Sequence, residues 1–282
     1  MAATGRAALD DSQFAAILQS DVIQELRPAM TSREFLRQAA PGASRVGQFV
    51  LYGDPGPATA PADDITDISS TAMADSNVQV TAAEVGWRID VSDFAKAITI
   101  QGGGLIGDAA AMVARCVAEK WEADLAALMD DFSNVTTTSA TLTPVDLLAA
   151  YSALEQRDIP GPYVGYVHPK QSGELRAEIA TTTASYAVGR DGDLVRPFTD
   201  SGFFGTYMGL PIWQTSLTVT TSGLIGGAVF SSKNALGFYE VWGPRIETQR
   251  DASLRSLEIV GTQAYGLVEI SDTRGQTLKS VA

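Results

Sequence analysis

The sequence predicts an α+β fold, in which strands and helices form separate clusters. Three observations favour it. A long helical pattern covers residues 105–132, two long β-rich runs follow at 234–248 and 254–270, and a long irregular stretch separates two strand-like segments near the N-terminus. The chain lacks the regular strand–helix alternation that is typical of a parallel sheet, and it contains no internal repeat.

Composition restricts the function classes. The chain has 282 residues, of which 45% are hydrophobic and 19% charged, enough for one large core or two modest domains. The net charge of −13 argues against a dedicated nucleic-acid binder, which would carry a basic patch. A single cysteine excludes an intrachain disulfide. The sequence has no secretory signal and no apolar run of about 18 residues, so we expect no membrane partner.

The first 47 residues are predicted to form an N-terminal arm. An amphipathic helix is expected at 11–20, where Phe14, Ile17 and Leu18 share a face, and a second short helix is expected at 31–39. Isolated helices of this length are marginal in water, so each should dock on another part of the structure.

The arm is followed by an unusually long loop. Strand-like segments at 48–52 and 77–89 flank a stretch with three prolines and little apolar bulk. Loops of this length are usually functional or disordered, and this one cannot bury itself, so we expect another subunit to cover it. Candidate inter-subunit contact residues lie on this segment and on the turn between the two long β runs: Tyr52, Asp54, Asp63, Asp64, Asp67, Trp87, Arg250 and Asp251.

Residues 85–100 alternate enough to predict extended structure, and the long helix follows. Its apolar residues recur at steps of three and four: Ile106, Ala110, Val113, Val117, Trp121, Leu125, Leu128 and Phe132. A helix over 105–132 spans roughly 40 Å and acts as a rigid strut.

The remaining elements are shorter until the C-terminal β runs. Thr143 is predicted to cap a helix that has Pro144 in its first turn and extends to about residue 157. A buried strand at 163–167, a helix at 171–180 and strands at 209–216 and 223–231 are expected next. The runs at 234–248 and 254–270 then predict a long antiparallel pair.

No motif predicts an active site. Gly102, Gly104 and Gly107 match the dinucleotide-binding pattern, but the second strand that such a fold needs is replaced by continuing helix, so we interpret them as a helix entry turn. His168 is the only histidine, and it lacks a nucleophile motif and is expected to be a turn residue. The acidic triplet 63, 64 and 67 does not fit a calcium loop. We therefore expect no enzyme, no cofactor and no metal site.

The order of elements, together with several local strings, resembles a known family. VHPKQSGELR, FGTYMGLPIWQTS, AVFSSKNALGFYE, IETQRD and AYGLVEISDTRGQTL are similar, in that order, to segments of the major capsid protein of tailed double-stranded DNA bacteriophages. The resemblance implies the Hong Kong 97-type fold. It assigns an N-terminal arm (1–47), an extended E-loop (48–87), a P-domain (88–140, with spine helix 105–132), an A-domain (141–232) and the P-domain's C-terminal strands (233–282).

The same resemblance implies function and partners. The protein would assemble with copies of itself, as pentamers and hexamers, into an icosahedral shell around DNA that it does not read by sequence. It would be built in the host cytoplasm and reside in the virion. Residues 48–87 contain no lysine, the donor of the isopeptide crosslink in some family members, so non-covalent contacts are expected. About 45 residues precede the loop, so we expect a separate scaffolding protein, with a portal and a cement protein as further partners.

Two alternatives stay open. An encapsulin-like nanocompartment shell shares the implied fold, but it would load a cargo enzyme in place of a genome. The breaks at Pro28 and Pro41 in the arm favour the phage reading over a continuous N-terminal helix. An α+β enzyme of unrecognised class is the other alternative, and a monomer with measurable turnover would support it.

Overall fold

A computed structural model describes residues 32–40, 44–53, 56, 58, 70, 72–98, 104–138, 140–181, 203–207, 209–221 and 223–282. The expected helix at 11–20 and most of the loop lie outside the described residues. The elements in chain order are η1 (Ser32–Phe35), β1 (Arg37–Gln38), β2 (Val46–Tyr52), β3 (Asp75–Thr81), β4 (Ala83–Ser92), α2 (Asp93–Ile98), α3 (Gly104–Asp130), β5 (Val135–Thr137), α4 (Pro144–Glu155), β6 (Tyr163–Val167), α5 (Pro169–Thr181), β7 (Phe203–Tyr207), β8 (Leu210–Gln214), β9 (Thr220–Thr221), β10 (Leu224–Ser231), β11 (Leu236–Asp251), β12 (Ser256–Glu269), η3 (Asp272–Arg274) and β13 (Gly275–Val281).

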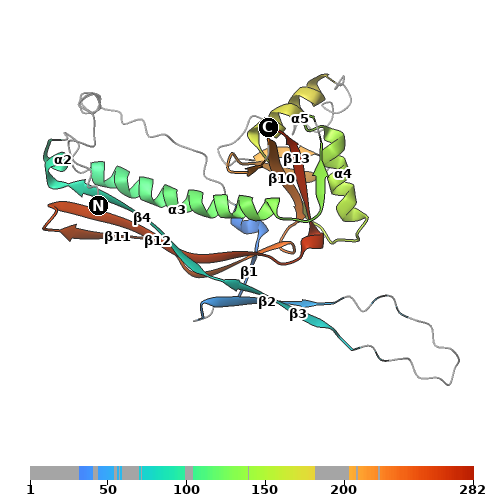
Figure 1. The fold of residues 1–282 in the computed structure, drawn as a ribbon, viewed down its shortest axis with the longest axis horizontal. Coiled ribbons are helices and arrows are strands. Elements are labelled where there is room, and N and C mark those ends of the chain that lie inside the picture. Colours follow the sequence, from blue (N-terminus) through green and yellow to red (C-terminus); the bar gives the residue numbers. More distant parts are fainter. Residues whose placement is uncertain are drawn as a thin grey trace.

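A long four-stranded sheet and the helix α3 form the extended half of the molecule. The strand order is β1-β11-β12-β4, and β12 pairs antiparallel with both β11 and β4. Figure 1 shows α3 lying along this sheet, which it contacts mainly at β12 and β4. Gly261 of β12 allows the close approach, because a Cβ there would lie 2.4 Å from Cγ1 of Val113. The long helix and the antiparallel pair are as the sequence predicted.

A second sheet builds the compact half, at the C-terminal end of α3 (Figure 1). Its order is β5-β13-β10-β6-β8-β7, with β9 beside β10. One face packs on α3 and the arm through Tyr166 and Phe230, and the other packs on α4 and α5 through Val167 and Val229. The sheet is therefore the middle of three layers. α4 begins with the expected cap, since Thr143 and Asp146 form a capping box.

The pairing of β13 was not foreseen. Residues 233–282 were expected to accompany the long β pair, but β13 pairs with β10 along seven residues in the compact sheet. The short strand β5 also joins that sheet, through parallel pairing with β13. Gly275 lets the chain enter β13 close to Phe132, because a Cβ on Gly275 would lie 2.2 Å from the Phe132 ring. The chain thus passes from the extended half to the compact half at η3.

Two local predictions were wrong. Residues 85–100 were expected to be extended throughout, but β4 ends at Ser92 and α2 follows. The Ser92 hydroxyl accepts a hydrogen bond from the Ala95 amide at 3.1 Å and so caps the helix. The expected helix at 31–39 is only the 3₁₀ turn η1, because the backbone of residues 37–38 pairs in parallel with β11 instead.

Candidate inter-subunit surface

The β2–β3 hairpin is seated on the body at its base. Phe49 and Val80 are buried there against Tyr239 and Ile270. Three close approaches fix the position of the hairpin on the body. A Cβ on Gly47 would lie 2.5 Å from the Tyr239 ring, one on Gly237 would lie 2.6 Å from the Phe49 ring, and one on Gly266 would lie 2.6 Å from the Thr81 carbonyl oxygen. Side chains cannot be accommodated at such distances, so the hairpin leaves the body in a fixed direction (Figure 1).

Polar contacts complete this seat. The Tyr239 hydroxyl donates to the Ser44 carbonyl at 2.6 Å. Nε of Arg45 donates to the Ala82 carbonyl at 3.1 Å, and the Ala82 amide returns a bond to the Arg45 carbonyl at 2.9 Å. The two ends of the hairpin are therefore tied to each other as well as to the body.

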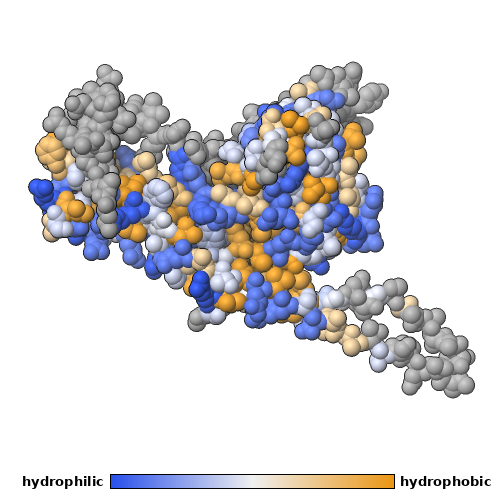
Figure 2. Space-filling model, viewed as in Figure 1, coloured by the Kyte–Doolittle hydropathy of each residue, from blue (hydrophilic) through white to orange (hydrophobic). Residues whose placement is uncertain are grey.

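The outer end of the hairpin lacks such cover. Val50, Tyr52 and Met73 are 48%, 65% and 72% exposed. The strands are still paired here, and the Gly53 amide donates to the Ala74 carbonyl at 2.9 Å. Figure 2 shows apolar residues gathered where the hairpin leaves the body. A two-stranded ribbon is marginal in water, and apolar side chains at its end indicate a surface that another molecule covers.

The expected contact residues fall in separate places. Tyr52 is at the hairpin's outer end, and Asp54, Asp63, Asp64 and Asp67 lie outside the described residues. Trp87 is on β4, an edge strand, and is 55% exposed. Trp87 pairs with Gly261 of β12, and Gly261 pairs with Ile246 of β11. Trp87 and Ile246, which are both exposed, therefore lie on the same face of the sheet as α3, one on each side of the helix.

Arg250 and Asp251 make contacts within the chain, at the turn between β11 and β12. Nη2 of Arg250 donates to Oδ2 of Asp93 at 2.7 Å and ties the turn to α2. Oδ1 of Asp251 accepts from the Ser253 hydroxyl and from the amides of Ser253 and Leu254, and these hydrogen bonds lower the pKa of the carboxyl group. An inter-subunit role for this pair stays a prediction.

Two further exposed apolar groups were missed by sequence reasoning. Phe94 and Ile98 of α2 and Leu254 of the neighbouring turn are 41–56% exposed at the far end of the long sheet. Val145 and Leu148 project from α4 and are 72% and 39% exposed. The α4 sequence, PVDLLAAYSALE, is apolar on all sides, and that pattern could have indicated a helix that is covered on both faces.

A buried carboxyl group lies where the arm meets α3. The Ser32 hydroxyl donates to Oε1 of Glu122 at 2.8 Å, and both residues are at least nine-tenths buried. Burial raises the pKa of Glu122 to about 7, although the Ser32 hydrogen bond opposes the shift. The hydroxyl of Tyr166, on the adjacent strand β6, is buried and has no partner among the described residues. The neutral acid is therefore the form that suits this junction.

The chemistry expected of an active site is not assembled in the described part of the chain. His168 caps the start of α5, where its Nδ1 accepts from the Lys170 amide at 3.1 Å, and burial followed by the Lys170 charge lowers its pKa. Gly104 and Gly107 lie in the first turn of α3, and α2 separates them from β4, so the strand–turn–helix context of a dinucleotide site is missing. No cluster of metal-ligating side chains occurs among the residues that could be described. Within the same residues, no helix is long and apolar enough to cross a membrane.

Comparison with known proteins identifies the family. A family model described as phage capsid protein matches residues 74–276. The chain belongs to this family of phage capsid proteins. The match includes β3 of the hairpin, β4, α3, the β11–β12 pair and most strands of the compact sheet, so the capsid protein is a component of a virion shell. No curated protein sequence matches the chain.

Solved structures share the capsid protein's fold at low sequence identity. That of Mycobacterium phage Che8 is 16% identical with a TM-score of 0.70, over 92% of this chain and 94% of that one. The capsid of Ralstonia phage GP4 is 10% identical with a TM-score of 0.72, over 94% of each chain. The SrpI encapsulin of Synechococcus elongatus PCC 7942 is 14% identical with a TM-score of 0.63, over 97% of this chain and 96% of that one. The fold is the Hong Kong 97-type capsid fold, as the family resemblance implied.

Proposed function

We propose that this capsid protein assembles with copies of itself, as pentamers and hexamers, into an icosahedral shell that encloses double-stranded DNA. The observation that carries the proposal is the β2–β3 hairpin, whose base is locked to the body and whose outer end exposes Val50, Tyr52 and Met73. A rigid arm with an uncovered apolar end is suited to lie across a neighbouring subunit. The protein acts as a structural element and not as an enzyme.

We also propose an assignment of the parts of the shell subunit, which the layers of the fold support. The N-terminal arm is residues 1–47, and the E-loop is the part of the hairpin from residue 48 onward, together with residues 53–74. The P-domain is α3 with the four-stranded sheet, and the A-domain is the compact sheet with α4 and α5. This assignment moves β5 and β13 into the A-domain, in keeping with their pairing.

Non-covalent contacts hold the proposed shell. Residues 48–87 offer no lysine for a crosslink, and exposed apolar groups on the hairpin, α2 and α4 supply area that permanent assemblies bury. The net charge of −13 keeps the wall from adhering to packaged DNA, which is enclosed without sequence-specific contacts. A scaffolding protein, a portal and a cement protein are the proposed further partners.

Negative-stain microscopy of the full chain, expressed alone and with the genes beside its own, tests the proposal. Closed shells or ring-shaped capsomers are expected from the wild type. A chain in which Gly and Ser replace residues 53–75 at equal length should remain a soluble, folded subunit without shells. Normal shells from that variant would contradict the role of the hairpin, and a wild type that stays monomeric under every condition would contradict the function.

An encapsulin-like shell is the second candidate, because the SrpI match spans nearly the whole chain. The contents of purified shells distinguish the two. Nuclease-protected DNA supports the capsid, whereas a co-purifying enzyme without DNA supports the compartment.

A further inference from the structure

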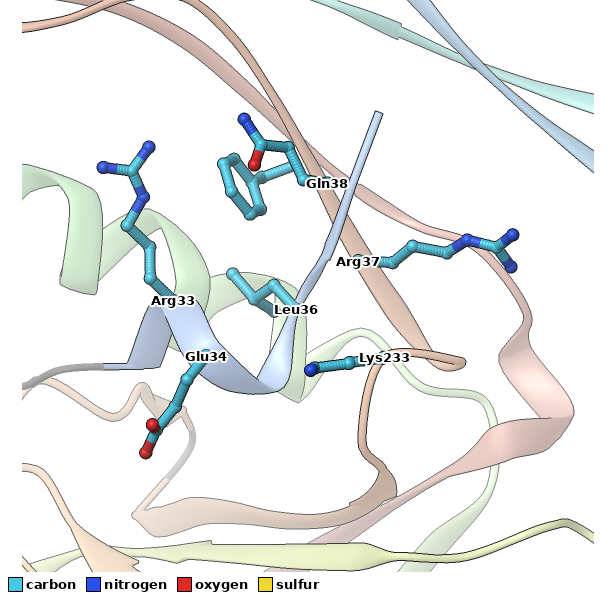
Figure 3. Close-up of a pocket in the computed structure, with 7 residues that line it drawn as sticks. Arg33, Glu34, Leu36, Arg37, Gln38 and Lys233 are labelled. Atoms are coloured by element: carbon cyan, nitrogen blue, oxygen red, sulfur yellow. The ribbon is translucent and has the colours of Figure 1, made fainter. Parts of the chain in front are cut away.

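The arm and the turn before β11 line an open basic pocket on the surface of the protein. The pocket has a volume of about 450 Å³, and its lining includes Arg33, Arg37 and Lys233 over the apolar side chains of Leu36 and Phe238. Figure 3 shows Lys233 directed towards Leu36 and Arg37 extending outward from the arm. Glu34 is the only acidic residue of the lining. Three cations around one cavity stand out in a chain with a net charge of −13.

Two of these cations, Arg37 and Lys233, form no polar side-chain interaction within the described part of the chain. Arg33 is engaged, because it forms an ion pair with Glu240 and its guanidinium lies 5.0 Å from the Phe238 ring centre. The side chains of Arg37 and Lys233 have no hydrogen bond or ion pair with any described residue, and both are exposed. Other cations, such as Arg88, Arg250 and Lys279, are paired with acids in the chain. Within the described residues, Arg37 and Lys233 therefore have no acidic counterpart.

The chain contains a segment of opposite charge. Residues 53–75 carry five acids and no lysine or arginine; the acids are Asp54, Asp63, Asp64, Asp67 and Asp75. The seven residues of β2 carry this segment about 20 Å from the hairpin base in an extended strand. Because the hairpin projects away from the body (Figure 1), the acidic segment of a second copy is better placed to reach the pocket than that of the same chain.

We propose that this pocket binds the acidic segment 53–75 of a second copy of the chain, with Arg37 and Lys233 as the paired cations. Duplex DNA fits the pocket less well, because tight binding to DNA needs many phosphate contacts and the pocket offers two available cations. The inference rests on the proposed function and adds to it: it names the receiving site and gives the acids of the loop a role.

Charge exchange in the full-length protein tests the pairing. Arg37→Asp with Lys233→Asp is expected to reduce the yield of sedimenting shells about tenfold or more, because like charges then face each other. Asp is suited to position 233, where φ is +61°, so the change adds little backbone strain. Adding Asp63→Lys and Asp64→Lys to the same chain should restore the shells. The control reverses two exposed cations outside the proposed contact surfaces, Lys120→Asp on α3 and Lys170→Asp on α5, whose surface ion pairs contribute little, and should keep the wild-type yield.

The outcomes separate the inference from the proposed function. Wild-type yield from the pocket variant would overturn the pocket and leave the shell function standing. A loss of shells that the lysine exchange does not rescue would overturn the acidic segment as occupant. Retention of a short DNA duplex by wild-type subunits, lost in the pocket variant, would assign the site to nucleic acid instead. Circular dichroism melts of the variants should match the wild type, and an unfolded pocket variant would overturn the view that these side chains are free of the fold.

Discussion

The base and the outer end of the β2–β3 hairpin carry similar residues in opposite surroundings. Phe49 is 4% exposed against Tyr239 and Gly237, whereas Tyr52, three residues further along the same strand, is 65% exposed. The difference separates two purposes of apolar residues in this chain. Those at the base form part of the core of the subunit, and those at the outer end are expected to be buried by another molecule.

The largest effect is expected from truncation at the base. Phe49→Ala should lower the free energy of unfolding by about 3–5 kcal/mol, because it removes a buried ring and leaves a cavity beside Gly237. Urea denaturation of unassembled subunits measures the loss. A loss equal to that of Tyr52→Ala would show that the base is not part of the core, and the comparison would fail.

The junction of arm and α3 offers a second test, through pH. The pKa of Glu122 is about 7 in the folded protein and 4.5 for the unperturbed group, so the native state binds more protons between these values. The contribution of Glu122 to the free energy of unfolding is complete below about pH 4.5 and is lost as pH rises through 7. The loss is at most about 1.4 kcal/mol for each pH unit. Glu122→Gln, which cannot ionise, should flatten this decline.

Urea midpoints at pH 5, near the lower end of that window, and at pH 8, about one unit above it, make the measurement for wild type, Glu122→Gln and a control, Glu84→Gln. Glu84 is exposed on β4, so its replacement removes a charge without touching the junction. An equal slope for wild type and Glu122→Gln would show that the carboxyl group is not the origin of the decline.

A close approach at the hairpin base gives a smaller effect. A Cβ on Gly266 would lie 2.6 Å from the Thr81 carbonyl oxygen and 2.8 Å from a methyl group of Val80. Gly266→Ala should therefore cost about 1–3 kcal/mol in unfolding free energy and shift the hairpin. Gly173→Ala on α5 meets nothing within 4 Å and should stabilise by about 0.5–1 kcal/mol. Thermal unfolding of the pair checks the contrast, and equal melting temperatures would contradict a seated hairpin.

Local patterns in the sequence were sufficient for the elements that local interactions specify. The apolar spacing from Ile106 to Leu125 predicted α3, and Thr143 with Pro144 predicted the start of α4. The pairing of β13 with β10 joins residues 45 to 57 positions apart, and the docking of Ser32 on Glu122 joins residues 90 positions apart. One sequence carries no periodic signal for contacts at such separations. Tyr52 and Trp87 could be predicted as exposed because they flank a loop that cannot bury itself, whereas the contacts of Arg250 with Asp93 could not.

The smallest effect on stability, and the largest contrast with assembly, is expected at the outer end. Tyr52→Ser with Met73→Ser should change the unfolding free energy by no more than about 0.5 kcal/mol, because both side chains are mostly exposed in the subunit. If these side chains are covered in the shell, the same change removes apolar contact from every neighbour pair, so sedimentation should show fewer or less stable shells. Gln79→Ser, on the same ribbon and exposed but polar, serves as the matched control. Stable shells from the double variant would mean that the hairpin end is uncovered in the assembly too, and its apolar residues would then need another explanation.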